Sequence, residues 1–157
     1  MSREKGIHKI ETHAACICIK EMKKDELKIL IGKRTPSRNL FPGYWECGGG
    51  QVHTGEDFEN AAIRQIKDEF GLDIKIEYTT GVYKIQTAGK IIPGIRFIAK
   101  PINENQDVIL NPDEFVEYKW ITEDELNRYN FIPTLKEDVK KALELYKKIK
   151  QSPSLHP

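Results

Sequence analysis

The sequence predicts an α/β protein in which a mixed sheet is covered by helices on both faces. Three observations support this fold class: short apolar segments typical of strands, two segments with helical periodicity, and their order along the chain. Two strands come first, a helix follows, several strands come next, and a helix ends the series. Strands and helices in this order are typical of a sheet packed between helices.

Two apolar segments near the N-terminus, 13–21 and 28–34, predict strands that pair as a hairpin across a charged turn. Cys16 and Cys18 then lie on one face of the first strand as small core side chains. A C-x-C metal pair is the alternative, but no second Cys or His pair at ligand spacing accompanies it. The segment 35–50 is rich in Pro and Gly, and we expect a long, functional loop.

The next segment predicts a helix over residues 57–70. Thr54 followed by Asp57 matches a capping box at its start, and Gly71 is a natural stop. Apolar residues recur at every fourth position of this helix and form a ridge that suits a core contact.

The second half of the chain predicts three more strands and two helices. The segment 122–129 begins with a capping box and predicts a short helix, whereas the amphipathic segment 134–150 predicts a longer one. The strands are expected at 74–86, 91–102 and 115–121.

Length and composition indicate one soluble domain over residues 1–157, with a core from about residue 10 to residue 150 and a disordered tail over 151–157. A net charge of +1 favours neither long nucleic acid nor an anionic membrane as a partner. The apolar run 14–19 is too short for a signal sequence or a membrane span. Three cysteines do not suggest a disulfide framework, so we expect a cytoplasmic protein.

Residues 48–72 join a run of three glycines to a helix with clustered acidic residues. Gln65, Asp68 and Glu69 fall within an arc of about 100° on this helix. Close carboxylates repel one another unless a cation lies between them, and oxygen ligands of this kind suit Mg²⁺ or Mn²⁺. A solvated helix face is the alternative. Because a glycine-rich turn lets the backbone approach a ligand closely, the combination predicts a cradle for metal-bound phosphates.

The same stretch resembles the Nudix box, G-x5-E-x7-R-E-U-x-E-E-x-G-U, in which U is apolar. Asp68 keeps the charge of one Glu position, whereas Gln65 replaces another Glu by a neutral amide. The segments FPGYWECGGG and DEFVEYKW also resemble parts of the family, so the resemblance covers most of the chain. The residues that match the box outright are Gly50, Glu56, Arg64, Ile66, Glu69, Gly71 and Leu72.

This resemblance implies a Nudix fold, which is an α/β/α sandwich around a mixed β-sheet. It also implies Mg²⁺-dependent hydrolysis (or Mn²⁺-dependent hydrolysis) of the pyrophosphate bond in a nucleoside diphosphate linked to another group. The expected partner is a small nucleotide-type molecule, and homodimers are common in the family. Arg64 is implied to orient a box carboxylate, with a surface ion pair as its alternative. The residues implied to lie at the metal are Gly49, through its carbonyl, and Glu56, Gln65, Asp68 and Glu69.

The general base and the substrate contacts are expected outside the box. Glu114 and Glu117 are the candidates for the base, and Glu114 is preferred because it is expected at a loop end. Cationic and aromatic side chains around the long loop are candidates for phosphate binding and base stacking, with solvated charges and core packing as the alternatives. The cations are Lys33, Arg34 and Arg38, and the aromatic residues are Phe41, Tyr44 and Trp45.

Gln65 leaves the activity open. An amide keeps one oxygen that can bind a metal, but it carries no charge and accepts no proton at neutral pH. A slower hydrolase, a hydrolase with its base elsewhere, and a nucleotide-binding module without turnover all fit the sequence. An isomerase that acts on a diphosphate is a further alternative.

Overall fold

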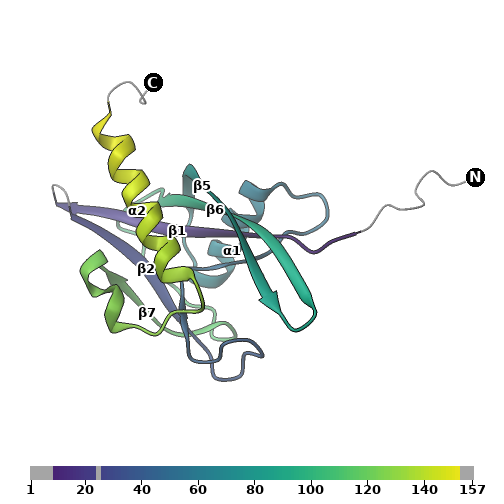
Figure 1. Ribbon diagram of the computed structural model, residues 1–157. Helices are drawn as coiled ribbons and strands as arrows, with labels where there is room; N and C mark the ends of the chain where they lie inside the picture. The colour runs from purple at the N-terminus through teal and green to yellow at the C-terminus, as the bar shows by residue number, and fades with distance from the viewer. Residues whose placement is uncertain (1–8, 24–25, 153–157) are drawn as a thin grey trace, which may run out of the picture.

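The computed structural model describes residues 9–23 and 26–152, and Figure 1 shows the arrangement of their elements. The expected tail over 151–157 lies outside the described residues from position 153 onward, whereas Gln151 is the last residue of the final helix. The strands are β1 (His13–Lys23), β2 (Glu26–Arg34), β3 (Trp45–Glu46), β4 (Gly49–Gln51), β5 (Ile74–Thr87), β6 (Lys90–Pro101) and β7 (Phe115–Ile121). The helices are α1 (Phe58–Phe70), the 3₁₀ helix η1 (Glu123–Arg128) and α2 (Leu135–Gln151).

The strands form one mixed sheet whose central order is β3-β2-β1-β6-β5, with β4 beside β1 and β7 beside β2. The pairing of β1 with β6 is parallel, and the other pairings are antiparallel. Strand β1 lies at the centre, and Ala14 to Ile19 are buried along it. The predicted fold class, an α/β/α sandwich around a mixed sheet, is therefore confirmed.

Alternation along β1 separates two hydrophobic cores, one on each face of the sheet. Ile17 and Ile19 belong to the core beneath α2, which lies in front of the sheet in Figure 1. Cys16 and Cys18 belong to the core beneath α1, which lies behind it. The two cysteines thus share one face, as the sequence predicted.

Helix α1 begins one residue later than expected, and its cap differs from the predicted one. Asp57 is the N-cap, and its side chain accepts a hydrogen bond from the Asn60 backbone N–H at 2.7 Å. Thr54 does not cap the helix, because the chain turns again before Asp57. Gly71 ends the helix in the left-handed conformation at φ 70°, where a side chain would be strained.

The segment 35–50 is not a loop throughout, because it contains β3 and the first residues of β4. Segments this short gain strand geometry only through their neighbours: Trp45 and Glu46 pair with β2, and Gly49 pairs with β1. The predicted strands 74–86, 91–102 and 115–121 and both later helices are confirmed to within a few residues at their ends. Among the described helices, none has the length and apolar character needed to cross a membrane.

We expect the substitution Asp57→Ala to lower the free energy of unfolding by about 1 kcal/mol, because the first turn of α1 loses a hydrogen-bond acceptor. Thr54→Ala is the matched control and should change stability by less than about 0.5 kcal/mol. Urea unfolding of the two variants measures both effects. Equal losses of stability in the two variants would contradict the assignment of the cap.

Candidate active site at the glycine turn

Three consecutive glycines, 48–50, follow Cys47 and run into β4, and a side chain at any of them would have to displace a neighbouring atom. A Cβ atom on Gly48 would lie 2.7 Å from the Ile66 side chain, and one on Gly49 would lie 2.6 Å from the β1 backbone. A Cβ on Gly50 would lie 2.6 Å from the Gln65 amide. Gly48 and Gly49 also adopt φ values of 102° and 144°, which side chains disfavour. The glycines therefore let the turn pack directly against α1.

The turn and the helix meet in a hydrogen bond between the Gly49 backbone N–H, which donates, and Glu69 Oε1, at 2.8 Å. The Glu69 side chain is buried, with 3% of the residue exposed. Burial, followed by the negative charge of Glu46, raises the pKa of Glu69 well above its usual range, and the Gly49 N–H opposes that rise. A cation beside this carboxylate would favour its ionised form.

A segment from residue 109 to residue 114 brings a second glutamate to the corner where the glycine turn meets the end of α1. The backbone N–H groups of Ile109 and Asn111 donate to carbonyls in the last turn of α1 at 2.8 and 3.0 Å. The Thr35 N–H then donates to the Glu114 carbonyl at 3.1 Å, and the Glu114 carboxylate pairs with Arg38. Glu114 therefore lies between the end of α1 and the long loop.

Arg64 contacts two acidic residues of the box sequence. Its guanidinium donates to both carboxylate oxygens of Glu56, at 2.6 and 2.9 Å, and lies 3.6 Å from Asp68 Oδ2. These hydrogen bonds, with one from the His53 N–H, lower the pKa of Glu56 to about 2. Asp68 is largely solvent-exposed, at 59% of its side chain.

Arg34 and Glu46 form a buried ion pair beneath the long loop, and Arg34 Nε also donates to the Leu40 carbonyl at 3.0 Å. The backbone of Arg34 exchanges hydrogen bonds with Tyr44 and Gly43 at 2.8 and 3.1 Å. Arg34 thus fixes the path of the loop, and it also lines a cavity beside the glycine turn.

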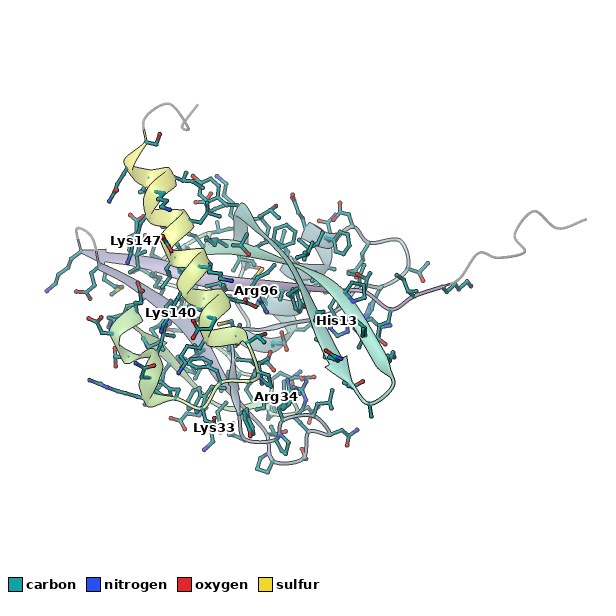
Figure 2. All side chains as sticks on the ribbon, viewed as in Figure 1. His13, Lys33, Arg34, Arg96, Lys140 and Lys147 are labelled. Carbon is teal, nitrogen blue, oxygen red and sulfur yellow. The ribbon has the colours of Figure 1, made fainter. Side chains whose placement is uncertain are left out.

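A cavity of about 540 Å³ opens beside the glycine turn. Figure 2 labels three basic residues that line it, His13, Arg34 and Arg96, around the space between α2 and the β5–β6 hairpin. Gly49 lines the cavity on one side and contacts Glu69 of α1 on the other. The polar and charged lining is His13, Arg34, Arg38, Glu46, Lys84, Gln86, Arg96, Thr134 and Asp138, and Phe41 and Tyr83 are its aromatic members.

Several predicted contact residues lie away from this cavity. Lys33 and Glu117 face each other in the register of β2 and β7, and the Glu117 carboxylate lies 3.6 Å from Lys119. Tyr44 packs against Phe41 at a centroid distance of 5.8 Å, and of these two only Phe41 lines the cavity.

Trp45 does not stack on a ligand, because it belongs to the core beneath α2. It is 8% exposed, and its ring lies 5.0 Å from that of Tyr129. Core packing, the alternative for this residue, is therefore correct.

Known proteins share the sequence pattern and the fold of this chain. The family model for the NUDIX domain matches residues 11–146 of the chain. The chain belongs to the Nudix family.

Curated relatives and solved structures agree with this assignment. The nucleoside triphosphatase NudI of Salmonella paratyphi B is 32% identical over 110 residues, which cover 64% of this chain and 77% of that protein. An Ap4A hydrolase of C. elegans, solved as a binary complex, superposes with a TM-score of 0.73 at 19% identity, over 88% of this chain and 99% of that one. The NUDIX domain of Shewanella oneidensis NrtR, solved with ADP ribose, gives a TM-score of 0.73 at 14% identity, over 92% and 94%.

The Nudix box residues have two kinds of contact in this structure. Glu56 and Arg64 tie the turn before α1 to the helix, whereas Glu69 is bonded to Gly49, which precedes the box and lines the cavity. Gln65 lies over Gly50, and its amide nitrogen donates to the Gln51 carbonyl at 3.2 Å.

The donor chemistry of this corner fits a divalent cation that is shared with a substrate. Among the described residues, no three Asp, Glu, His or Cys side chains are arranged to hold a metal by themselves. Mg²⁺ is commonly bound through one or two carboxylates together with substrate phosphates. Glu69 and Asp68, with the neutral oxygens of Gln65 and Gly49, are a donor set of that kind.

Sequence reasoning missed several residues around the cavity, among them Glu46, Tyr83, Arg96 and Asp138. Arg96 gave one usable signal, a lone charge within an otherwise apolar strand, GIRFIA. Asp138 gave none, since a charged residue in an amphipathic helix is ordinary.

We expect Glu69→Gln to raise the stability of the metal-free protein at neutral pH. The folded-state pKa of Glu69 is raised, so its stabilising contribution is complete below its ordinary value of 4.5 and is lost as the pH rises through the folded pKa. Glutamine keeps an oxygen for the Gly49 N–H and does not ionise. Urea unfolding in a chelator at pH 5 and pH 8 should therefore show the variant gaining on the natural protein at the higher pH. A constant difference between the two proteins would contradict this electrostatic account.

Proposed function

We propose that this protein hydrolyses the pyrophosphate bond of a nucleoside diphosphate linked to another group, with Mg²⁺ or Mn²⁺ as cofactor. The observation that carries the proposal is the position of Gly49, whose N–H holds Glu69 while the same residue lines the cavity. A phosphate that enters along the glycine turn therefore arrives beside the buried carboxylate of α1.

The charge of the cavity supports an anionic substrate. Four permanent cations line it, whereas two carboxylates do. Arginine binds phosphate through paired N–H groups, and a positive lining raises the local concentration of anions. The cations are Arg34, Arg38, Lys84 and Arg96, and the carboxylates belong to Glu46 and Asp138.

In this proposal Glu69 and Asp68 hold the cation, helped by the oxygens of Gln65 and Gly49. When bound, the cation would neutralise phosphate charge and polarise water. Arg64 keeps Glu56 and the turn in place through its paired hydrogen bonds. Arg34 and Arg38 orient the phosphates at the cavity wall.

Glu114 is the preferred general base, ahead of Glu117. Segment 109–114 is hydrogen-bonded to the last turn of α1, and Glu114 is among the charges that raise the pKa of Glu69, so it lies within electrostatic reach of the corner. Glu117 points along the β2–β7 pair toward Lys119 and has no such link. Arg38 holds Glu114 as an ion pair, and substrate phosphate would compete for the same guanidinium.

The names of related proteins support a nucleotide as the substrate. The relative in Salmonella paratyphi B is called a nucleoside triphosphatase, and the two similar structures are an Ap4A hydrolase and a domain complexed with ADP ribose. A cytoplasmic location remains a prediction from composition, and a homodimer remains an expectation of the family.

A panel assay tests the proposed function. Phosphate and pyrophosphate release would be measured with Mg²⁺, with Mn²⁺ and with chelator, on nucleoside triphosphates, their oxidised forms, ADP-ribose, dinucleoside polyphosphates and NADH. Metal-dependent release from at least one compound is expected. Tight nucleotide binding without release from any compound would favour the alternative of a binding module.

On the substrate that the panel identifies, Glu69→Gln should lower kcat by about a hundredfold or more, the usual effect of losing a preorganised charged group. Glu59→Gln is the matched control, since Glu59 lies exposed in the first turn of the same helix, and its kcat should stay within about twofold. Circular dichroism would verify that both variants fold. Full activity in a folded Glu69→Gln protein would contradict the assignment of Glu69 to the metal site.

Gln65→Glu should bind Mg²⁺ more tightly and raise kcat, because it adds a negative charge beside Asp68 and Glu69. Two unit charges about 4 Å apart interact by about 4 kcal/mol at an effective dielectric constant of about 20, so the change is measurable. Gln65→Met is the matched control, which keeps the volume but removes the oxygen and should weaken Mg²⁺ binding. Titration of kcat with Mg²⁺ compares the three proteins. No gain for Gln65→Glu at any concentration would show that position 65 is not a weakened ligand.

A further inference from the structure

We infer that Arg96 determines base specificity by recognising the lactam edge of a nucleobase, in which a carbonyl oxygen stands beside a ring N–H. Guanine, uracil and thymine present such an edge, and adenine does not. The inference rests on the proposed function, because it requires the cavity to hold a nucleotide.

The sheet register places Arg96 at a defined separation from the glycine turn. Ala15 of β1 pairs with Gly49 of β4 on one side and with Arg96 of β6 on the other. Two strand spacings therefore separate Gly49 from Arg96, which is about 10 Å between their backbones. That separation exceeds the distance between neighbouring phosphates and is comparable to that between a phosphate and the base of one nucleotide.

The sheet surface between these two residues carries only small side chains, so a ligand can lie against it. Residues paired across a sheet point to the same face, so Gly49, Ala15 and Arg96 share the face that the cavity covers. Gly49 has no side chain and Ala15 has only a methyl group. A nucleotide with its phosphates at the glycine turn therefore reaches Arg96 with its opposite end.

The Arg96 guanidinium has more hydrogen-bond donors than protein partners. Arg96 is 7% exposed, and Nη1 donates to Asp138 Oδ2 at 2.6 Å. Arg96 Nε is buried and has no hydrogen-bond partner among the described residues. A guanidinium carries five N–H donors, and a buried donor that lacks an acceptor costs free energy. A ligand oxygen in the cavity would supply that acceptor after a small rotation of the side chain.

Tyr83 and Gly94 hold the guanidinium in place. The Arg96 guanidinium carbon lies 4.2 Å from the centre of the Tyr83 ring, over its face. A Cβ atom on Gly94 would lie 2.6 Å from that ring, so the ring occupies the space that glycine leaves. With one face on Tyr83 and one nitrogen on Asp138, the guanidinium is limited to small movements.

Asp138 completes the recognition of a lactam. Its carboxylate is 30% exposed on the side chain and lines the cavity beside Arg96, so an acceptor stands next to a donor. A carbonyl oxygen meets the arginine, and the neighbouring ring N–H meets the carboxylate. Adenine bound in the pose that guanine takes would place its amino group, a donor, against the guanidinium and its N1 lone pair against the carboxylate, so both contacts would be mismatched.

Titration calorimetry with GMP, UMP, AMP and inorganic pyrophosphate tests the inference, because none of the three nucleotides contains a pyrophosphate bond to be cleaved. The natural protein should bind GMP and UMP about tenfold or more tightly than AMP. Arg96→Gln and Arg96→Lys should lose most of that preference, since neither residue offers a planar fork of donors. Their affinity for pyrophosphate should change by less than about twofold. Arg128→Gln is the matched control, as Arg128 forms an exposed ion pair on η1 away from the cavity, and it should keep the preference.

Each contrary result overturns the assignment. Equal affinity of the natural protein for AMP, GMP and UMP would do so without any variant. A parallel loss of pyrophosphate and nucleotide affinity in both Arg96 variants would make Arg96 a phosphate-binding residue. A lower melting temperature with an unchanged preference would make it structural. Nucleotide binding with the predicted preference but no hydrolysis in the panel assay would reject the hydrolase and keep the specificity, so the two failures are distinguishable.

Discussion

The hydrogen bond from the Gly49 N–H to Glu69 is the contact on which the site depends. It joins a turn that can exist only with glycine to a helix that carries the acidic residues. The bond also supplies a donor to a buried carboxylate whose pKa is raised. Strongly perturbed carboxylates of this kind are concentrated at functional sites, which agrees with the metal-binding role proposed for Glu69.

The sheet positions everything else around that contact. Strand β1 lies between β4 and β6, so the glycine turn and Arg96 occupy neighbouring strands although they are far apart in sequence. Helix α1 covers one face and supplies Glu69, whereas α2 covers the other and supplies Asp138. Gly49 is the point at which a group on one face of the sheet comes within reach of a cavity on the other.

Ion pairs around the cavity hold its walls in place. Arg34 is committed to Glu46 and to the backbone of the long loop, and Arg38 is shared with Glu114. Arg96 differs from both, because its Nε is buried and has no hydrogen-bond partner among the described residues. The cavity therefore combines fixed positive charge near the turn with one under-used donor group at its far end.

The sequence by itself determined the fold class, most element positions and the box that joins turn to helix. These features follow from local patterns: apolar periodicity, the glycine stop at Gly71 and the spacing of charged residues on one helix. Only the tertiary structure decided that Trp45 is core, that Asp57 and not Thr54 caps α1, and that Arg96, Tyr83 and Asp138 meet at one cavity. The cap depends on how the chain turns before α1. The cavity depends on strand register and helix docking, which bring together residues from β5, β6 and α2, and no local pattern encodes such distances.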